Sequence, residues 1–166
     1  MAGYGDDSSF AAWLASQGLV LPEGSPVPAV LRQIGSDYVD AAYENSLKCS
    51  HRAGGFEQEL AWPRTGHKVN GQSVPETLIP PAWVNASYRA AYLQATVPGW
   101  ATTGTDATRQ TKREKVEGIE REFFAGDESA GSSVAAGMPS DSIINGMVGP
   151  WLCSGGRNLN TLFRVI

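Results

Sequence analysis

With 166 residues, the chain is long enough to bury one hydrophobic core without help from a metal or a disulfide. Its formal net charge of -4 argues against a protein whose main task is to grip nucleic acid, because affinity for phosphates comes chiefly from lysine and arginine. No stretch approaches the roughly 20 apolar residues of a membrane-spanning helix, so we expect no membrane association. The first residues lack the basic and apolar regions of a signal peptide, which predicts synthesis in the cytoplasm.

Three amphipathic stretches in the first 100 residues predict helices that form one small bundle. Apolar residues recur at helical spacing in residues 8–17, 27–47 and 81–97. Residues 48–80 keep no helical period and contain many glycines and prolines, which predicts a long structured loop. We therefore expect a mainly α-helical fold whose core is a small helical bundle.

Residues 101–138 predict a linker and one short element of β structure. Polar and apolar residues alternate from Ile119 onward, and Glu117-Gly118 predicts either a turn between two strands or a bulge in one. We expect an edge of this element to pair with another chain, either a second copy or a different protein, with its charges setting the register. The residues assigned to this strand contact are Lys112, Arg113, Lys115, Val116, Ile119 and Phe123.

Residues 139–166 predict a helix followed by an extended C-terminal arm. Ser140 or Asp141 can cap the helix, and Gly149-Pro150 should kink or end it. An apolar stripe of this kind is either the buried face of a core helix or a face that lies on another protein. The glycine- and serine-rich segment 125–138 before it favours the second interpretation. The stripe and the tail contain Ile143, Ile144, Met147, Val148, Trp151, Leu152, Leu162, Phe163, Arg164 and Val165.

The cysteines and histidines do not predict a reactive site. Cys49 and Cys153 lie far apart in sequence and outside any Cys-x-x-Cys pair, so we expect two reduced thiols. Together with His51 and His67 they offer too few ligands to predict a metal centre. No Gly-x-Ser-x-Gly motif or phosphate-binding loop occurs either. We therefore expect no enzyme activity, no cofactor and no metal.

Three stretches, in this order, carry a resemblance to a known family: Tyr38-Val39-Asp40, then Leu60-Ala61-Trp62-Pro63-Arg64-Thr65-Gly66, then Ile79-Pro80-Pro81-Ala82-Trp83-Val84-Asn85-Ala86. They resemble the head-tail adaptor (connector) proteins of tailed bacteriophages, which are often labelled DnaT-like single-stranded DNA-binding proteins. The second stretch is the most distinctive. The later strand region, the helix after Pro139 and the tail ending in Arg164-Val165 are also similar, so the likeness covers most of the chain.

The resemblance implies a structural virion protein without enzyme activity, located in the neck between capsid and tail. It implies a homo-oligomeric ring, typically of twelve copies, beneath the portal protein and above a downstream tail-completion protein. Genome DNA would pass through the lumen of this ring without specific binding. Residues 139–166 would form the arm that docks on the portal, and Trp62, Pro63, Arg64, Ile79, Pro80 and Trp83 would serve subunit packing.

Two questions stay open at the level of sequence. Trp62 and Arg64 either form a recognition element for a carboxylate on the next subunit, or Trp62 fills the core while Arg64 points to water. The alternative function is a replication accessory that binds single-stranded DNA, with the basic cluster of residues 109–115 on the phosphates and Phe123 and Phe124 stacking on bases. Interleaved glutamates count against that cluster as a DNA site.

Overall fold

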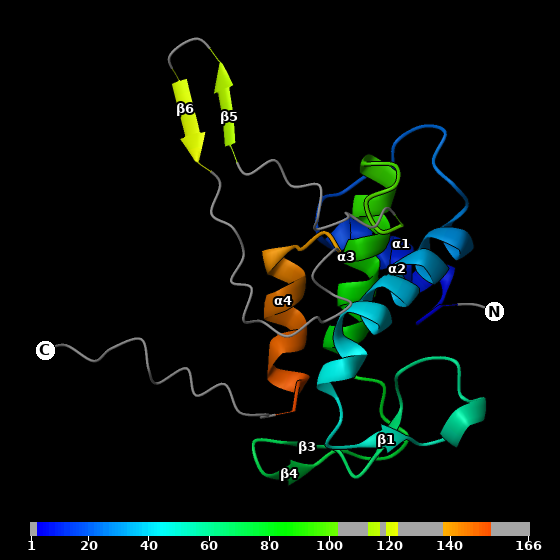
Figure 1. Ribbon diagram of the computed structural model, residues 1–166. Helices are drawn as coiled ribbons and strands as arrows, with labels where there is room; N and C mark the ends of the chain where they lie inside the picture. The colour runs from blue at the N-terminus through cyan, green and yellow to red at the C-terminus, as the bar shows by residue number, and fades with distance from the viewer. Residues whose placement is uncertain (1–2, 103–112, 117–118, 123–137, 154–166) are drawn as a thin grey trace, which may run out of the picture.

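The protein is mainly α-helical, with short strand pairs outside the helices (Figure 1). The computed structural model describes residues 3–102, 113–116, 119–122 and 138–153. Within these ranges the α-helices are α1 (Asp7–Ser16), α2 (Pro28–Tyr43), α3 (Pro81–Thr96) and α4 (Ser142–Val148). The prediction of a mainly helical fold is confirmed, and the three helices expected in the first 100 residues lie within about one turn of their predicted ends. None of the described helices is long and apolar enough to span a membrane.

Local sequence explains where these helices begin and end. The Asp6 carboxylate accepts a hydrogen bond from the Ser9 amide (2.7 Å), and the Ser9 hydroxyl accepts one from the Asp6 amide (3.0 Å). This reciprocal cap starts α1, and Gly18 follows the helix with a φ of 65°. Both α2 and α3 begin with a proline, whose missing amide hydrogen costs nothing in the first turn.

The long loop between α2 and α3 is built from short pieces. They are the 3₁₀ turns η1 (Glu44–Ser46) and η2 (Gly55–Glu57), and the strands β1 (His51–Arg52), β2 (Arg64–Thr65), β3 (Lys68–Val69) and β4 (Gln72–Ser73). Strand β1 pairs antiparallel with β2, and β3 pairs antiparallel with β4. Asn70 and Gly71 have φ values of 51° and 81°, the left-handed conformations that a tight hairpin turn requires.

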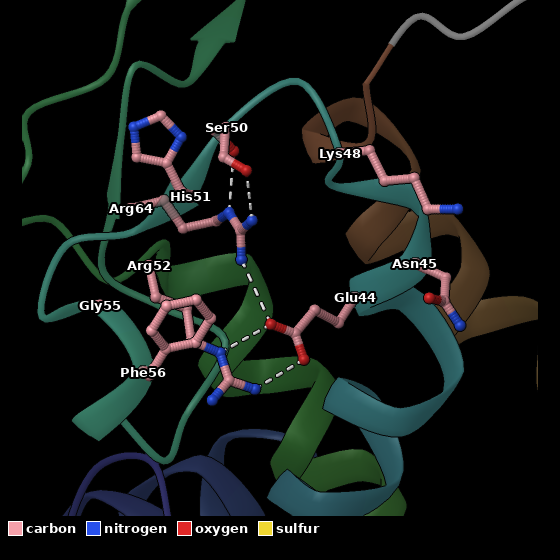
Figure 2. A pocket seen from close by; sticks show the side chains of 9 residues that line it. All are labelled: Glu44, Asn45, Lys48, Ser50, His51, Arg52, Gly55, Phe56 and Arg64. Carbon is pink, nitrogen blue, oxygen red and sulfur yellow. Dashed lines mark hydrogen bonds and ion pairs between the residues drawn. The ribbon is translucent and has the colours of Figure 1, made fainter.

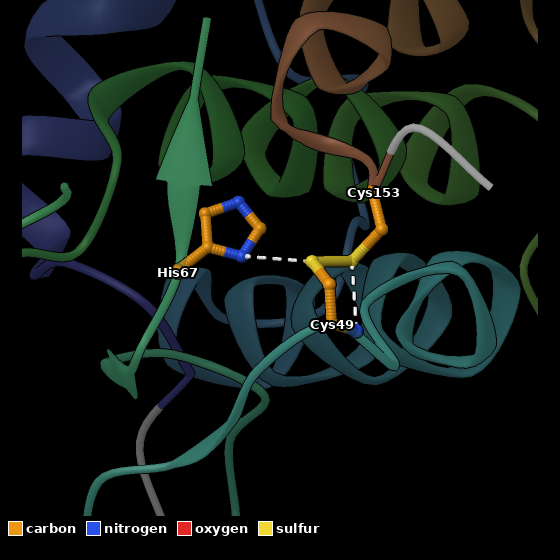
Figure 3. Close-up of side chains that lie close together, drawn as sticks. All are labelled: Cys49, His67 and Cys153. Atoms are coloured by element: carbon orange, nitrogen blue, oxygen red, sulfur yellow. Dashed lines mark hydrogen bonds between the residues drawn. A yellow bond between two sulfur atoms is a disulfide. The ribbon is translucent and has the colours of Figure 1, made fainter. Parts of the chain in front are cut away.

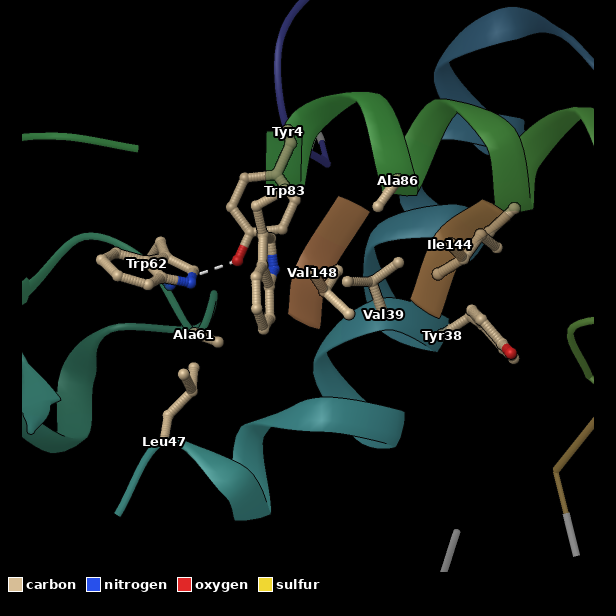
Figure 4. Close-up of a cluster of buried hydrophobic side chains, with 11 residues drawn as sticks. Tyr4, Tyr38, Val39, Leu47, Ala61, Trp62, Trp83, Ala86, Ile144 and Val148 are labelled. Carbon is tan, nitrogen blue, oxygen red and sulfur yellow. Dashed lines mark hydrogen bonds between the residues drawn. The ribbon is translucent and has the colours of Figure 1, made fainter. Parts of the chain in front are cut away.

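The helices share a core in which α2 and α3 lie against each other, α1 covers one part and α4 another. Gly35 permits the close approach of α2 to α3, because a Cβ atom there would lie 2.1 Å from the Ser87 carbonyl oxygen. Figure 4 shows the larger of two clusters of buried side chains. Its members are Tyr4, Tyr38, Val39, Leu47, Ala61, Trp62, Trp83, Ala86, Ala90, Ile144 and Val148.

The helix that the sequence assigned to a docking arm lies in this core. Ile144 and Val148 are both 0% exposed, whereas the adjacent Ile143 is 49% exposed. The Asp141 carboxylate caps α4 and also pairs with Arg89 of α3 at 3.3 Å. Residues 139–153 are therefore part of the folded domain, which corrects the expectation of a separable arm from residue 139. Ile144 and Val148 of the apolar stripe thus pack in the core of the same chain.

The predicted β element consists of two strands, β5 (Arg113–Val116) and β6 (Ile119–Glu122), paired antiparallel on either side of residues 117 and 118. This confirms the interpretation of two strands over that of one bulged strand, while residues 117 and 118 themselves lie outside the described residues. In the register, Arg113 is opposite Glu122, Glu114 opposite Arg121, and Lys115 opposite Glu120. The register thus pairs residues of opposite charge, a sequence pattern that favours this pairing. Lys112 and Phe123 lie outside the described residues.

Candidate functional site

The three stretches that carry the family resemblance meet at one buried carboxylate, Asp40. Its oxygens accept hydrogen bonds from the Tyr4 hydroxyl (2.9 and 3.0 Å), the Ala61 amide (2.7 Å) and the Trp83 indole (2.9 Å). The Tyr4 hydroxyl in turn accepts a hydrogen bond from the Trp62 amide (3.2 Å). Asp40 therefore joins the N-terminal segment, α2, the loop and α3, and the family motif is a structural junction in the core.

Burial and hydrogen bonding act on Asp40 in opposite directions. Burial, the larger effect, raises the pKa of its carboxyl group, while the bonds from Ala61, Trp83 and Tyr4 lower it. The Tyr4 pKa is raised well above its ordinary value, first by burial and then by the nearby carboxylate. The phenol therefore stays protonated and remains a donor to Asp40 at physiological pH.

Trp62 and Arg64 match neither sequence interpretation completely, that is, neither a recognition element nor a buried Trp62 beside a solvent-facing Arg64. Trp62 fills the core at 1% exposure, as the second interpretation expected. Arg64, however, is 4% exposed, so it does not point to water. Its guanidinium donates to the Ser50 hydroxyl (2.8 Å) and to the carbonyl oxygens of Ala61 (3.0 Å), Leu47 (3.1 Å) and Ser50 (2.6 Å). Arg64 thus organises the backbone of the loop.

Glu44, at the end of α2, holds two arginines of the loop in place. The Arg52 guanidinium donates to both Glu44 carboxylate oxygens at 2.7 Å, and Arg64 lies 3.5 Å from one of them. The hydrogen bond from Arg52 is the largest cause of a lowered Glu44 pKa, so this carboxylate is ionised at neutral pH. Burial lowers the pKa of Arg64. The bidentate ion pair between Glu44 and Arg52 fixes the loop against the end of α2.

An open cleft of about 650 Å³ lies where this loop meets the end of α2 (Figure 2). Lys48, Arg52 and Arg64 bring three positive charges to its walls and Glu44 brings one negative charge, which gives the cleft a formal charge of +2. Phe56 lines the same cleft and is 109% exposed, more than in an extended reference peptide. Among the described residues, no other phenylalanine, tyrosine or tryptophan side chain is exposed. Asn45, Ser50, His51 and Gly55 complete the lining.

A second group of side chains joins distant parts of the chain beside this cleft (Figure 3). Cys49 and Cys153 form a disulfide with a Cα to Cα distance of 5.8 Å, which corrects the expectation of two reduced thiols. The Nδ1 atom of the buried His67 lies 3.8 Å from the Cys49 sulfur and 2.9 Å from the Ser50 hydroxyl. Burial is the largest cause of a lowered His67 pKa, so its imidazole is neutral at pH 7.

The other predicted site residues are divided between core and surface. Pro80 and Trp83 are buried near Trp62, and Ile79 is 37% exposed. Met147, Trp151 and Leu152 are partly buried against the core. Arg109 and Lys112 of the basic cluster, and the tail residues Leu162, Phe163, Arg164 and Val165, lie outside the described residues.

The cleft was missed by sequence reasoning because its parts are distributed over a loop without periodicity. Lys48, Arg52 and Phe56 are spaced four residues apart, yet they follow no helix, and only the fold shows that they line one cleft together with Arg64. The one available signal was the large aromatic Phe56 after Gly54-Gly55, because a bulky ring in a glycine-rich turn has little chance of burial.

Comparison with known proteins places the chain in a family. A family model described as "Putative DnaT-like ssDNA binding protein" matches residues 4–165. Searches of curated proteins and of solved structures gave no match. The match supports the DnaT-like label, but nothing in it mentions a phage adaptor. Because the family model covers nearly the whole sequence, the chain belongs to the DnaT-like family.

Proposed function

We propose that this protein binds single-stranded DNA and that the cleft beside Phe56 is the contact site. The observation that carries the proposal is a fully exposed aromatic ring on the wall of a cleft with excess positive charge. Proteins that bind single strands combine these two elements, a basic groove for the backbone and aromatic rings on which bases stack. The family description names the same activity.

The chemistry assigns a role to each side chain. Phe56 offers a face to a base, which would remove apolar surface of both from water. Lys48 is exposed and can approach a phosphate as a point charge. Arg52 uses three of its five N–H groups on Glu44 and Gln58, which leaves two for a phosphate oxygen. Because Glu44 already holds the guanidinium, little side-chain entropy is lost on binding.

The overall charge of -4 lowers the affinity for single-stranded DNA without abolishing binding. At physiological ionic strength the Debye length is about 8 Å, so acidic residues beyond that distance are largely screened from a phosphate in the cleft. Two cations on the backbone predict a salt slope of about -1.4 in log K against log salt for a single strand. We therefore expect weak, salt-sensitive binding with little sequence preference.

Fluorescence anisotropy of a labelled oligothymidylate of about 20 nucleotides tests the proposal, at low and at moderate salt. Phe56→Ala should raise Kd about 5- to 150-fold, which corresponds to about 1–3 kcal/mol for one stacked base. Lys48→Ala should reduce the salt slope by about 0.7. Val20→Ala, at a residue that is 81% exposed and lies before α2, and Lys68→Ala are matched controls and should bind like the wild type.

The proposal fails if the wild-type chain does not bind at low salt. It also fails if it binds but Phe56→Ala binds equally well, since the site would then lie elsewhere.

A second candidate function, a head-tail adaptor in a phage neck, is favoured by the β5–β6 hairpin. This pair is a sheet of its own, and among the described residues no further strand pairs with either outer edge. A free sheet edge readily pairs with another chain. Under this proposal the hairpin joins copies into a ring that contacts the portal and a tail-completion protein, and DNA crosses the lumen without specific binding. Neither candidate function includes a catalysed reaction.

Light scattering after size-exclusion chromatography separates the two candidates when it is combined with the DNA titration. An adaptor should form closed oligomers that dissociate when residues 113–122 are replaced by a glycine-serine linker, and should leave the oligonucleotide unbound. It should also occur in purified virions at the copy number of the portal. A monomer that binds the oligonucleotide would instead exclude the adaptor.

A further inference from the structure

Three metal-ligating side chains from distant parts of the sequence converge beside the cleft. The sulfur atoms of Cys49 and Cys153 and a ring nitrogen of His67 all lie within 4.8 Å of one another (Figure 3). Cys49 follows η1, His67 lies between β2 and β3, and Cys153 follows the 3₁₀ turn η5 (Gly149–Trp151) at the end of α4. No family or activity described above assigns a role to this group.

We propose that, when the disulfide is reduced, Cys49, Cys153 and His67 bind a zinc ion. Zinc takes thiolate ligands at about 2.3 Å and imidazole at about 2.0–2.1 Å in tetrahedral geometry, which places a sulfur and a nitrogen ligand about 3.5 Å apart. The Cys49 sulfur and His67 Nδ1 are 3.8 Å apart before any adjustment. Binding then requires the two sulfurs to separate from bonding distance to about 3.8 Å, and the metal to replace the Ser50 hydroxyl that lies 2.9 Å from Nδ1.

The surroundings permit that separation. Cys49 is exposed and Cys153 is only partly buried at the edge of the core, whereas His67 is 0% exposed. Trp62 packs edge-on against the imidazole, with ring centroids 4.8 Å apart. With three protein ligands, the fourth position of a tetrahedral zinc ion would be taken by water.

Charge and ligand type favour zinc over other common ions. Two thiolates and a neutral imidazole cancel the double charge of zinc, so the nearby Arg64, which donates to Ser50 at 2.8 Å, would face a neutral centre. Thiolate and imidazole are ligands that zinc accepts and that magnesium and calcium do not. The absence of a carboxylate in this group points the same way.

The redox step that exposes the site is simple. A dithiol reductant gives two electrons and two protons to the disulfide, the S–S bond breaks to give two thiols, and the reductant closes to its own disulfide. Zinc then displaces the two thiol protons, which pass to buffer. Oxidised and zinc-bound forms both tie the start of the loop to the end of α4. The zinc site would thus maintain under reducing conditions the cross-link that the disulfide makes under oxidising ones.

Cobalt titration of the full-length chain tests this inference independently of DNA binding. The protein is reduced with dithiothreitol, desalted without oxygen and titrated with Co²⁺. One equivalent should give the near-ultraviolet charge-transfer band of thiolate ligation, and Zn²⁺ should abolish it. The oxidised protein should show no band. Zinc should also raise the Tm of the reduced chain and leave that of the oxidised chain unchanged.

Two substitutions complete the test. Cys153→Ser should weaken zinc binding at least about 100-fold, more than the loss of an outer-shell partner does. His51→Asn changes an exposed histidine of the same loop and should leave the affinity unchanged. The inference is overturned if the reduced wild-type chain gives no charge-transfer band, or if Cys153→Ser binds zinc as tightly as the wild type. The wild-type spectrum decides even if a variant fails to fold.

Discussion

Replacing Asp40 by alanine should strongly lower the free energy of unfolding. The change removes the acceptor of the Tyr4 hydroxyl, the Ala61 amide and the Trp83 indole, and these three residues are 1%, 0% and 0% exposed. A buried donor without a partner costs about 1–3 kcal/mol, so three donors would cost about 3–9 kcal/mol. The substitution also removes a carboxylate that burial disfavours in its charged form, as the raised Asp40 pKa indicates. This gain offsets part of the cost. We expect a net loss of about 3–5 kcal/mol.

A milder variant keeps this prediction measurable, because a loss of that size approaches the whole stability of many domains. Asp40→Asn preserves the shape but turns one acceptor into a donor, so either the Ala61 amide or the Trp83 indole faces another N–H group. We expect a loss of about 1–3 kcal/mol for this variant. Asp37→Asn, at an exposed position on the same helix, is the matched control and should stay within about 0.5 kcal/mol of the wild type.

Urea unfolding followed by tryptophan fluorescence measures both losses, with equal m values as the sign that only stability changed. If Asp40→Ala unfolds within about 1 kcal/mol of the wild type, the carboxylate is not the junction that we infer.

Three further predictions concern the helices and the cleft. Gly35→Ala should destabilise the fold by about 1–3 kcal/mol in urea, because its Cβ would lie 2.1 Å from a carbonyl oxygen of α3. Ile144→Ala should cost about 2–5 kcal/mol and Ile143→Ala much less, whereas a freely projecting arm would make the two equal. The Glu44 pKa is lowered from 4.5 by Arg52, so its contribution to stability is complete above pH 4.5 and is lost as the pH falls through the folded value. The difference in unfolding free energy between wild type and Glu44→Gln should therefore shrink below about pH 4.5, and a constant difference would refute the ion pair.

Periodicity predicted the elements that are regular over several residues. The helical stretches stand out because each buries one face, and the β5–β6 hairpin stands out because its residues alternate. The turn at Asn70-Gly71 carried an equally good signal, since this dipeptide favours the left-handed conformations of a two-residue hairpin, and it was missed inside a loop rich in glycine.

The site could not be predicted because its parts meet only in three dimensions. Asp40 lies 21 residues from Ala61 and 43 from Trp83, and Cys49 lies 104 residues from Cys153. No local pattern contains such pairs. The apolar stripe of α4 was ambiguous for a different reason, since a core helix and a docking helix present the same spacing.

The core shown in Figure 4 also has a consequence for how the chain folds during synthesis. Tyr4 and Val148 belong to one cluster, although nearly the whole described sequence separates them. A nascent chain cannot complete this cluster until α4 has left the ribosome. Until then, Trp62 and Trp83 remain partly exposed to water. Translation speed through the last third of the message, and chaperones near the tunnel exit, should therefore influence the yield of folded protein.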